Sequence, residues 1–220
     1  MNDPSETRYL RLFPLQSVVL YPGMELPLVV FEPRYLQLTK ECTESDEPFG
    51  VLLLREGHEV GEVELNPYEV GTTAHIIEVT PMGENRLQVT AVGGMRFRIR
   101  SFDRSQPYLG AEVEMLRDEP LDIVDPALVG NIKEGANAFI RKLMAIRGGF
   151  VRDVPFPSDP STLSYHIAQL FQGNPEVQQS LLEQPVLDRL KEERDLIKSA
   201  MQRLAERERG EGPGHRFSAN

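Results

Sequence analysis

The stretch that decides the fold lies near the start of the chain and reads LFPLQSVVLYPGMELPLVVFEPRY (residues 12–35). A first apolar segment ends at the turn-forming pair Pro22–Gly23, and a second apolar run covers residues 26–31. Pro33 then suits the first position of a helix, because proline loses no helical hydrogen bond there. This order of strand, turn, strand and short helix predicts that the chain opens with a mainly β domain.

The composition is that of an ordinary globular protein. The chain has 220 residues, of which 40% are hydrophobic and 26% are charged, which suffices for one large domain or two small ones. Acidic residues outnumber basic ones by 34 to 24, for a net charge of -10. This balance argues against a dominant role in binding nucleic acid or an anionic membrane.

Targeting signals are absent from the sequence pattern. Residues 1–6 lack the basic and apolar segments of a signal peptide, and no apolar run approaches the roughly 20 residues that span a bilayer. Cys42 is the only cysteine, which excludes an intramolecular disulfide and fits a reducing compartment. We therefore expect a cytoplasmic protein that does not contact a membrane.

Residues 8–117 alternate between apolar and polar side chains, which indicates β structure. The near-continuous apolar runs at 26–31 and 48–54 predict strands that are covered on both faces. Between them, a helix is predicted from Pro33 to Cys42, because its apolar residues recur at helical spacing.

Two hairpins follow these strands. The first joins residues 73–80 to 86–92, and the second joins 95–102 to 108–116. Successive hairpins of this kind predict a closed or half-closed β-barrel, which removes exposed strand edges.

The apolar period becomes helical in the second half of the chain. Four helix starts carry a proline at the first helical position: Asp125-Pro126, Asp159-Pro160, Asn174-Pro175 and Gln184-Pro185. We therefore expect an α+β fold with a barrel at 8–118, a helical subdomain at 119–206 and a disordered, charged tail at 207–220.

Several segments resemble one family in the same order along the chain. These segments are 12–35, 69–79, 92–99, 108–114, 163–168 and 179–183. Together they are similar to the Lon N-terminal (substrate-binding) domain over about residues 8–205. The resemblance implies a PUA-like β-barrel followed by helices, and binding of unfolded or degron-bearing protein segments without catalysis. It also implies a stand-alone protein that lacks the ATPase and protease domains of Lon.

No motif in the sequence predicts an enzyme. A phosphate-binding P-loop is missing, and the adjacent pair Lys198–Ser199 lies on a predicted helix, where neighbouring side chains point apart. The histidines are scattered and Cys42 is alone, so no ligand spacing for a metal occurs. His75 shares a predicted strand face with Ile77, which favours partial burial. We expect no catalytic residue, no metal and no cofactor.

Arg96, Arg98 and Arg100 alternate along one predicted strand and therefore share a face. One interpretation is an RNA-binding stripe on a PUA-like module. The other is structural, because the predicted hairpin places Arg98 opposite Glu112 and Arg96 opposite Glu114, which supports cross-strand ion pairs. We favour the structural interpretation and keep RNA binding as the alternative function.

Apolar residues at predicted turns and loops are the candidates for a protein-binding surface. They are Tyr21, Pro22, Met24, Tyr68, Met82, Phe150 and Phe156. Methionine and aromatic side chains adapt to varied partners. The competing interpretation for each is packing of the loop over the barrel or the helices.

The predicted partners follow from these assignments. They are unfolded or degron-bearing segments, with a Lon-type protease as a further candidate, in the role of adaptor, holdase or competitor for substrates. Leu190, Ile197 and Leu204 are seven residues apart on the last predicted helix. They favour packing on the chain's own bundle over a short coiled coil, hence a monomer or weak dimer.

Overall fold

The computed structural model describes residues 7–55, 66–118, 124–171 and 173–210. It divides into two compact units. The barrel unit comprises residues up to Glu119 together with Gln169–Gln184, and the helical unit comprises Pro120–Ala168 and the residues from Pro185 onward. In the described residues no helix is long and apolar enough to cross a membrane.

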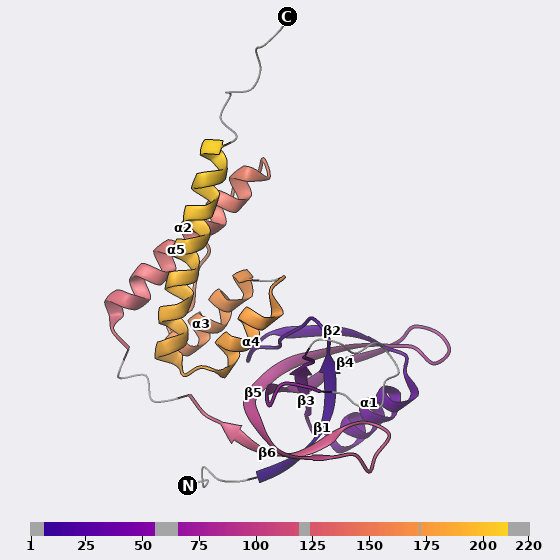
Figure 1. Cartoon of the computed structure of the whole chain (residues 1–220). Coiled ribbons are helices and arrows are strands. Elements are labelled where there is room, and N and C mark those ends of the chain that lie inside the picture. Colours follow the sequence, from indigo (N-terminus) through magenta and orange to yellow (C-terminus); the bar gives the residue numbers. More distant parts are fainter. Residues whose placement is uncertain (1–6, 56–65, 119–123, 172, 211–220) are drawn as a thin grey trace, which may run out of the picture. The chain divides into compact units, whose positions relative to one another are not determined.

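The barrel unit is built on one six-stranded sheet (Figure 1). Its strands are β1 (Thr7–Leu15), β2 (Glu25–Val30), β3 (Phe49–Leu53), β4 (Val70–Pro81), β5 (Leu87–Asp103) and β6 (Gly110–Leu116). The strand order is β2-β5-β4-β3-β1-β6, and an additional pairing of β5 with β6 closes the ring. The long β5 thus pairs with β4 and β6 in the ring, and with β2 beside it. This confirms the predicted α+β class with a barrel at its start.

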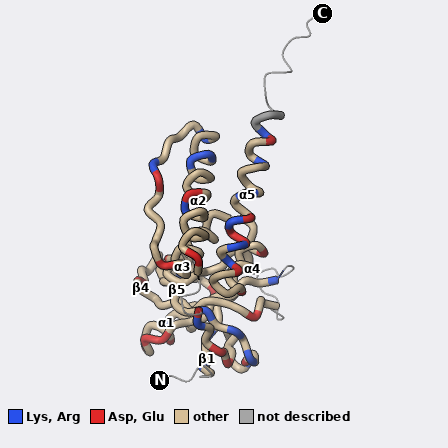
Figure 2. The backbone as a smooth tube through the Cα atoms, turned by 90° about the vertical axis from the view of Figure 1, so that its left-hand side faces the viewer, with Lys and Arg blue, Asp and Glu red and all other residues tan. Residues whose placement is uncertain are grey.

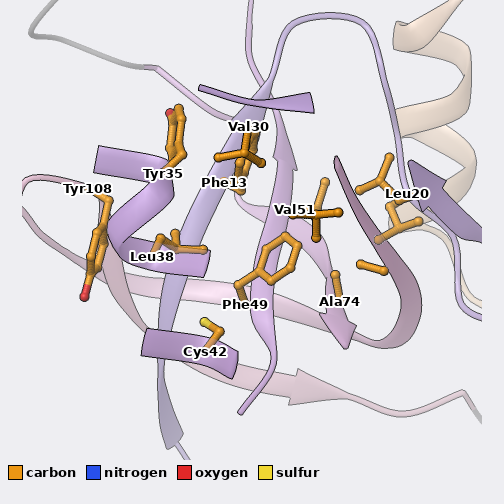
Figure 3. Packing of buried hydrophobic residues seen from close by; sticks show 13 residues of the cluster. Phe13, Leu20, Val30, Tyr35, Leu38, Cys42, Phe49, Val51, Ala74 and Tyr108 are labelled. Atoms are coloured by element: carbon orange, nitrogen blue, oxygen red, sulfur yellow. The ribbon is translucent and has the colours of Figure 1, made fainter. Parts of the chain in front are cut away.

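Helix α1 (Pro33–Ser45) packs its apolar side into the barrel core. Tyr35, Leu38 and Cys42 are buried at the predicted helical spacing, and the ring of Tyr35 stacks on that of Phe13 with centroids 4.2 Å apart. Figure 3 shows Leu38 and Cys42 of this helix on the side of Phe49, which belongs to the same cluster. Burial of the thiol raises the pKa of Cys42 to about 11, so this cysteine is a packing residue.

A second cluster surrounds the fully buried ring of Phe97 on β5. The space for this ring comes from Gly71 on the adjacent strand β4 and Gly50 on β3. A Cβ on Gly71 would lie 2.3 Å from the carbonyl oxygen of Val51 and 2.8 Å from the Phe97 ring. Glycine is therefore required where β3, β4 and β5 approach closely.

The helical unit contains α2 (Pro126–Ile146), α3 (Pro160–Ala168) and α5 (Val186–Gly210). The predicted starts at Pro126 and Pro160 are confirmed, and α5 begins at Val186, one residue after the predicted Pro185. Asp125 caps α2 by accepting a hydrogen bond from the backbone N–H of Ala127 at 2.9 Å. Leu190 and Ile197 of α5 are buried within this unit, as expected for packing on the chain's own bundle. Because α5 continues to Gly210, the predicted tail is wrong for residues 207–210, and 211–220 lie outside the described residues.

Helix α4 (Pro175–Glu183) and the short helix η2 (Gln169–Phe171) belong to the barrel unit. The predicted helical subdomain at 119–206 is thus interrupted by a segment that packs on the barrel. Gln179 of α4 donates from Nε2 to the carbonyl oxygen of Val70 at 3.0 Å. Helical periodicity identifies the apolar side of α4, but it does not say which surface that side covers.

Two local predictions differ from the structure. The run at 26–31 was expected to be covered on both faces, yet β2 alternates between buried and exposed residues and is paired with β5 alone. In the β5–β6 hairpin, Arg98 lies opposite Glu114 and Arg96 opposite Leu116, two residues from the predicted register. The loop is centred later than Ser105, and a β-bulge lies between Ile99 and Ser101.

Candidate functional site

Tyr21 was a candidate for a protein-binding surface, but its side chain is buried in the barrel unit. Its hydroxyl donates a hydrogen bond to the carbonyl oxygen of Gln178 in α4 at 2.8 Å. The competing interpretation, packing of the turn, therefore fits Tyr21, because a segment more than 150 residues later in the chain covers it. Tyr21 holds α4 on the barrel.

The rest of this turn is also a fold element. Gly23 has a φ of 79° and donates its N–H to the carbonyl oxygen of Gly93 at 2.8 Å, and Met24 donates to Tyr21 at 3.1 Å. A Cβ on Gly93 would lie 2.2 Å from the Tyr21 carbonyl oxygen, so glycine is required there. Pro22 and Met24 are half-buried beside it.

Tyr68 and Met82 are placed differently from each other. Tyr68 is half-buried, with the Arg55 guanidinium 4.0 Å from its ring centroid. Met82 is exposed just after β4 and donates its N–H to the Arg86 carbonyl oxygen at 2.9 Å. Of the candidates in the barrel unit, Met82 is the exposed one.

Phe150 and Phe156 lie in the helical unit, in the loop after α2. The returning part of this loop is held on α2, because Asn137 accepts from the Val154 N–H at 2.7 Å and donates to its carbonyl oxygen at 3.3 Å. Phe156 is half-buried, whereas Phe150 is 86% exposed. The loop thus packs back on its own helix and leaves one aromatic side chain in solvent.

An exposed apolar surface on the sheet was missed in the sequence. Its apolar members are Val29 (53% exposed) and Phe31 (51%) from β2 and the residue after it, Ile77 (59%) from β4, and Met82 (52%). Pro27 is also exposed on β2. We call these five residues the β2 face. A contiguous apolar run predicts burial on both sides, so the open side of β2 could not be recognised from the sequence alone.

Strand register places the members of the β2 face in order. Val29 lies opposite Gln88 and Pro27 opposite Thr90, while Leu26 and Val30 turn into the core. Ile77 is the extra residue of a β-bulge between Ile76 and Glu78. The apolar side chains thus line strand β2 and reappear on β4, with polar β5 residues between them.

Charges around the β2 face are mainly acidic. Glu25, Glu78 and Glu84 are exposed on its strands and turn, and Arg86 lies with its guanidinium carbon 5.9 Å from the Phe31 ring centroid. A surface with apolar side chains and a carboxylate rim is suited to apolar segments that carry basic residues.

Arg96 does not form part of an exposed stripe, because its side chain is only 5% exposed. Its guanidinium donates to the carbonyl oxygens of Leu182 at 2.7 Å and Gln184 at 3.0 Å, at the C-terminal end of α4. It also pairs with Asp118. A cation at this end satisfies the last carbonyls of a helix and complements its dipole.

The other two arginines of the predicted stripe are exposed, and Arg100 pairs with Glu114 on β6. The structural interpretation of the stripe therefore fits the contacts of Arg96 and Arg100, although the pairing partners differ from those predicted. Lys and Arg also alternate with Asp and Glu along α5 (Figure 2). The RNA-binding alternative has no support in these contacts.

A charged cluster on β1 and α1 is fully engaged in structural contacts. Arg11 donates from Nε to Glu41 at 2.9 Å and from Nη1 to Glu47 at 3.0 Å. Tyr108 also donates to Glu41, and this hydrogen bond is the main reason that the pKa of Glu41 falls to about 2. With each polar group partnered, the cluster offers no free group for chemistry.

The described residues gather no group of three or more metal-ligating side chains. His75 is exposed, so its predicted partial burial is wrong, and His166 contacts the Thr162 carbonyl oxygen of its own helix at 2.8 Å. Lys198 and Ser199 are both exposed on α5. His58 and His215 lie outside the described residues.

Comparison with known proteins identifies the class of domain to which this fold belongs. The model of the ATP-dependent protease La (LON) substrate-binding domain matches residues 9–199. The chain belongs to this family.

Curated relatives are Lon proteases. The Lon protease of Anaeromyxobacter dehalogenans is 27% identical over 179 residues, 80% of this chain and 21% of the relative. Lon protease 2 of Myxococcus xanthus is 27% identical over 212 residues, 90% of this chain and 25% of the relative. The chain thus spans about a quarter of the length of these two relatives.

Solved structures support the fold. The Lon N-terminal domain protein from Xanthomonas campestris has a TM-score of 0.63 at 25% identity, with 84% of this chain and 96% of that chain covered. The N-terminal domain of a Mycobacterium avium complex Lon protease has a TM-score of 0.64 at 14% identity, with 87% and 98% covered. The predicted family and α+β fold are confirmed.

Proposed function

We propose that the chain binds unfolded or degron-bearing polypeptide segments through the β2 face, and that it does so without catalysing a reaction. The observation that carries the proposal is the exposure of Val29, Phe31, Ile77 and Met82 on one sheet surface. The matched family model describes a substrate-binding domain, which supports polypeptide as the ligand class.

The physical reason is that an unfolded chain exposes apolar side chains which a folded protein buries. Half-exposed phenylalanine and methionine side chains recover part of their burial when such a segment covers them. Methionine adapts its shape to different partners, and an aromatic ring gives a large contact area at a low entropic cost. The β2 face therefore suits varied apolar sequences.

A matched pair of phenylalanines tests this proposal. Phe31 and Phe102 are both partly exposed on the same sheet, and each has an arginine guanidinium 5.9 Å from its ring centroid. We expect Phe31→Ser to weaken binding of a reduced, carboxymethylated, fluorescently labelled polypeptide about tenfold. The variant lacks the exposed part of the phenylalanine ring, so that apolar area is no longer buried when the ligand binds. Phe102→Ser should bind like the unsubstituted protein in the same anisotropy titration.

If both variants bind as tightly as the unsubstituted protein, the assignment of the β2 face is contradicted. Equal weakening of both would also contradict it, because the loss would then follow phenylalanine content rather than position. Urea unfolding of each variant controls for folding, and both changes should stay within about 0.5 kcal/mol of each other.

The biological role that we propose is adaptor or holdase in protein quality control, with a Lon-type protease as a candidate partner. A holdase suppresses aggregation of a heat-denatured protein by itself, whereas an adaptor speeds degradation only when the protease is present. A competitor for substrates slows that degradation. The three outcomes are separated by one aggregation assay and one degradation assay, each repeated with Phe31→Ser.

A further inference from the structure

Strand β2 is an edge strand. It pairs with β5 along Glu25–Val30, and within the described residues no strand pairs with its other side. The exposed side chains of Val29 and Phe31 stand beside this open edge. An open edge that also carries apolar side chains is the arrangement to which extended peptides add as a further strand.

The direction of the backbone groups follows from the ladder. Gly93 donates its N–H to the carbonyl oxygen of Met24 at 2.8 Å, and backbone groups alternate in direction along an antiparallel strand. Residues Leu26 and Leu28 therefore face β5, and Glu25, Pro27 and Val29 turn their backbone groups to the open edge. Pro27, which has no N–H, fits this outward position.

We infer that β2 receives its ligand by strand addition: an extended, apolar polypeptide segment flanked by lysine or arginine pairs with the open edge and lays alternate side chains against Val29 and Phe31. This inference rests on the proposed function and specifies how the same site binds. The backbone pairing supplies affinity for any sequence, and the apolar side chains select segments that unfolding exposes.

The charges favour this occupant over a second copy of the chain. Glu25, Glu78 and Glu84 surround the face and Arg86 is held near Phe31, so a segment with basic flanks is attracted. Each copy carries a net charge of -10, so two copies repel each other when their edges approach.

A single substitution separates strand addition from simple apolar contact. Val29→Pro removes the outward N–H of Val29 but keeps a three-carbon apolar side chain, and it leaves the groups that face β5 untouched. Pro27 shows that the strand accepts proline at an outward position. Val29→Ala is the matched control, because it keeps the N–H and loses apolar surface.

The probe is a fluorescein-labelled synthetic peptide with alternating valine and phenylalanine between two pairs of lysines. We expect Val29→Pro to weaken its binding about tenfold, because one backbone hydrogen bond is lost and its partner is left unpaired, and Val29→Ala to weaken it roughly two- to threefold. If Val29→Pro binds like the unsubstituted protein while Phe31→Ser still weakens binding, strand addition is overturned and the apolar site stands. If Phe31→Ser has no effect, the proposed function itself fails.

Amide hydrogen exchange of the unsubstituted protein gives a second measurement that needs no variant. In the free protein the amides of Leu26 and Leu28 should already be protected and that of Val29 should exchange quickly. Adding the peptide should protect the amide of Val29. Unchanged exchange at Val29 in the saturated complex would overturn strand addition, as would protection that appears without peptide when the protein is concentrated, since a second copy would then be the occupant.

Discussion

Two neighbouring apolar segments of the barrel unit have opposite environments. The side chain of Tyr21 is buried, because α4 covers it and the Gln178 carbonyl oxygen accepts a hydrogen bond from the Tyr21 hydroxyl. Strand β2, which begins four residues after Tyr21, leaves Val29 and Phe31 half in solvent. The two segments have similar apolar compositions. The turn has a structural role because a later segment, α4, packs on it, whereas β2 has an open surface because none of the described segments covers it.

The comparison predicts that changes at the turn affect stability and not the open surface. Tyr21→Ala should destabilise the protein by about 4 kcal/mol, because it leaves a cavity under α4 and an unpaired carbonyl. Tyr21→Phe should cost about 1 kcal/mol through the lost hydrogen bond alone. Urea unfolding measures both, and a Tyr21→Phe variant that stays fully folded but loses polypeptide binding would reverse the roles assigned to the two segments.

Arg96 and Arg98 sharpen the same comparison on one strand. Arg96→Met should destabilise the protein by about 3 kcal/mol, because Asp118 and the last carbonyls of α4 lose their buried partner. Arg98→Met, at an exposed position, should change the free energy of unfolding by less than about 0.5 kcal/mol. Equal changes in the free energy of unfolding for the two variants would show that the contacts of Arg96 with α4 do not stabilise the protein. RNA binding that is lost in Arg98→Met would revive the alternative function.

A buried carboxylate extends the comparison to the helical unit. Glu193 is fully buried on α5, and its carboxylate oxygens have no hydrogen-bond partner in the described residues. Burial raises its pKa well above 4.5, against the attraction of Arg189 and with a smaller contribution from the Glu192 charge.

The sign of the pH effect follows from this raised pKa. The unfolded chain releases the Glu193 proton above its ordinary pKa of 4.5, whereas the folded chain keeps it, so the contribution to stability is complete below that pH and is lost as the pH rises. Glu193→Gln should therefore gain stability relative to the unsubstituted protein between pH 5 and pH 8, as measured by urea midpoints. If the difference in stability between Glu193→Gln and the unsubstituted protein is the same at pH 5 and pH 8, Glu193 is not protonated in the folded protein.

The smallest expected effect concerns the far side of the β2 face. Met82→Ser should weaken binding of the unfolded polypeptide roughly threefold, because Met82 follows β4 and lies away from strand β2 at the border of the face. Met95→Ser is the control, since Met95 is also an exposed methionine of the sheet but is not part of the β2 face. If anisotropy titrations show that Met95→Ser binds more weakly than Met82→Ser, the binding site lies near Met95 and not on the β2 face.

Much of the fold was predictable from local patterns. Three local signals identified the elements and their order: proline at or just before the start of each α-helix, the spacing of Tyr35, Leu38 and Cys42, and the hairpin turns. Such signals depend on residues close together in the chain, which is why they can be read without a structure.

The rest depended on contacts between distant segments. Nothing near Arg96 in the sequence indicates that Leu182 and Gln184 will accept its hydrogen bonds. The same return of α4 buried Tyr21, which had looked like an exposed turn residue. Conversely, the run at 26–31 looked like a covered strand, and the open side of β2 became visible only with the sheet order. Among the candidate residues, Met82 and Phe150 are exposed.

The most direct measurement of the central claim is an NMR titration of the whole chain with a reduced, carboxymethylated polypeptide. We expect the backbone and methyl signals of Val29, Ile77 and Met82, and the backbone signal of Phe31, to shift in a saturable way. The signals of Tyr21 and Leu182 should not shift. Shifts confined to the turn and α4, with the β2 face unchanged, would contradict the central claim.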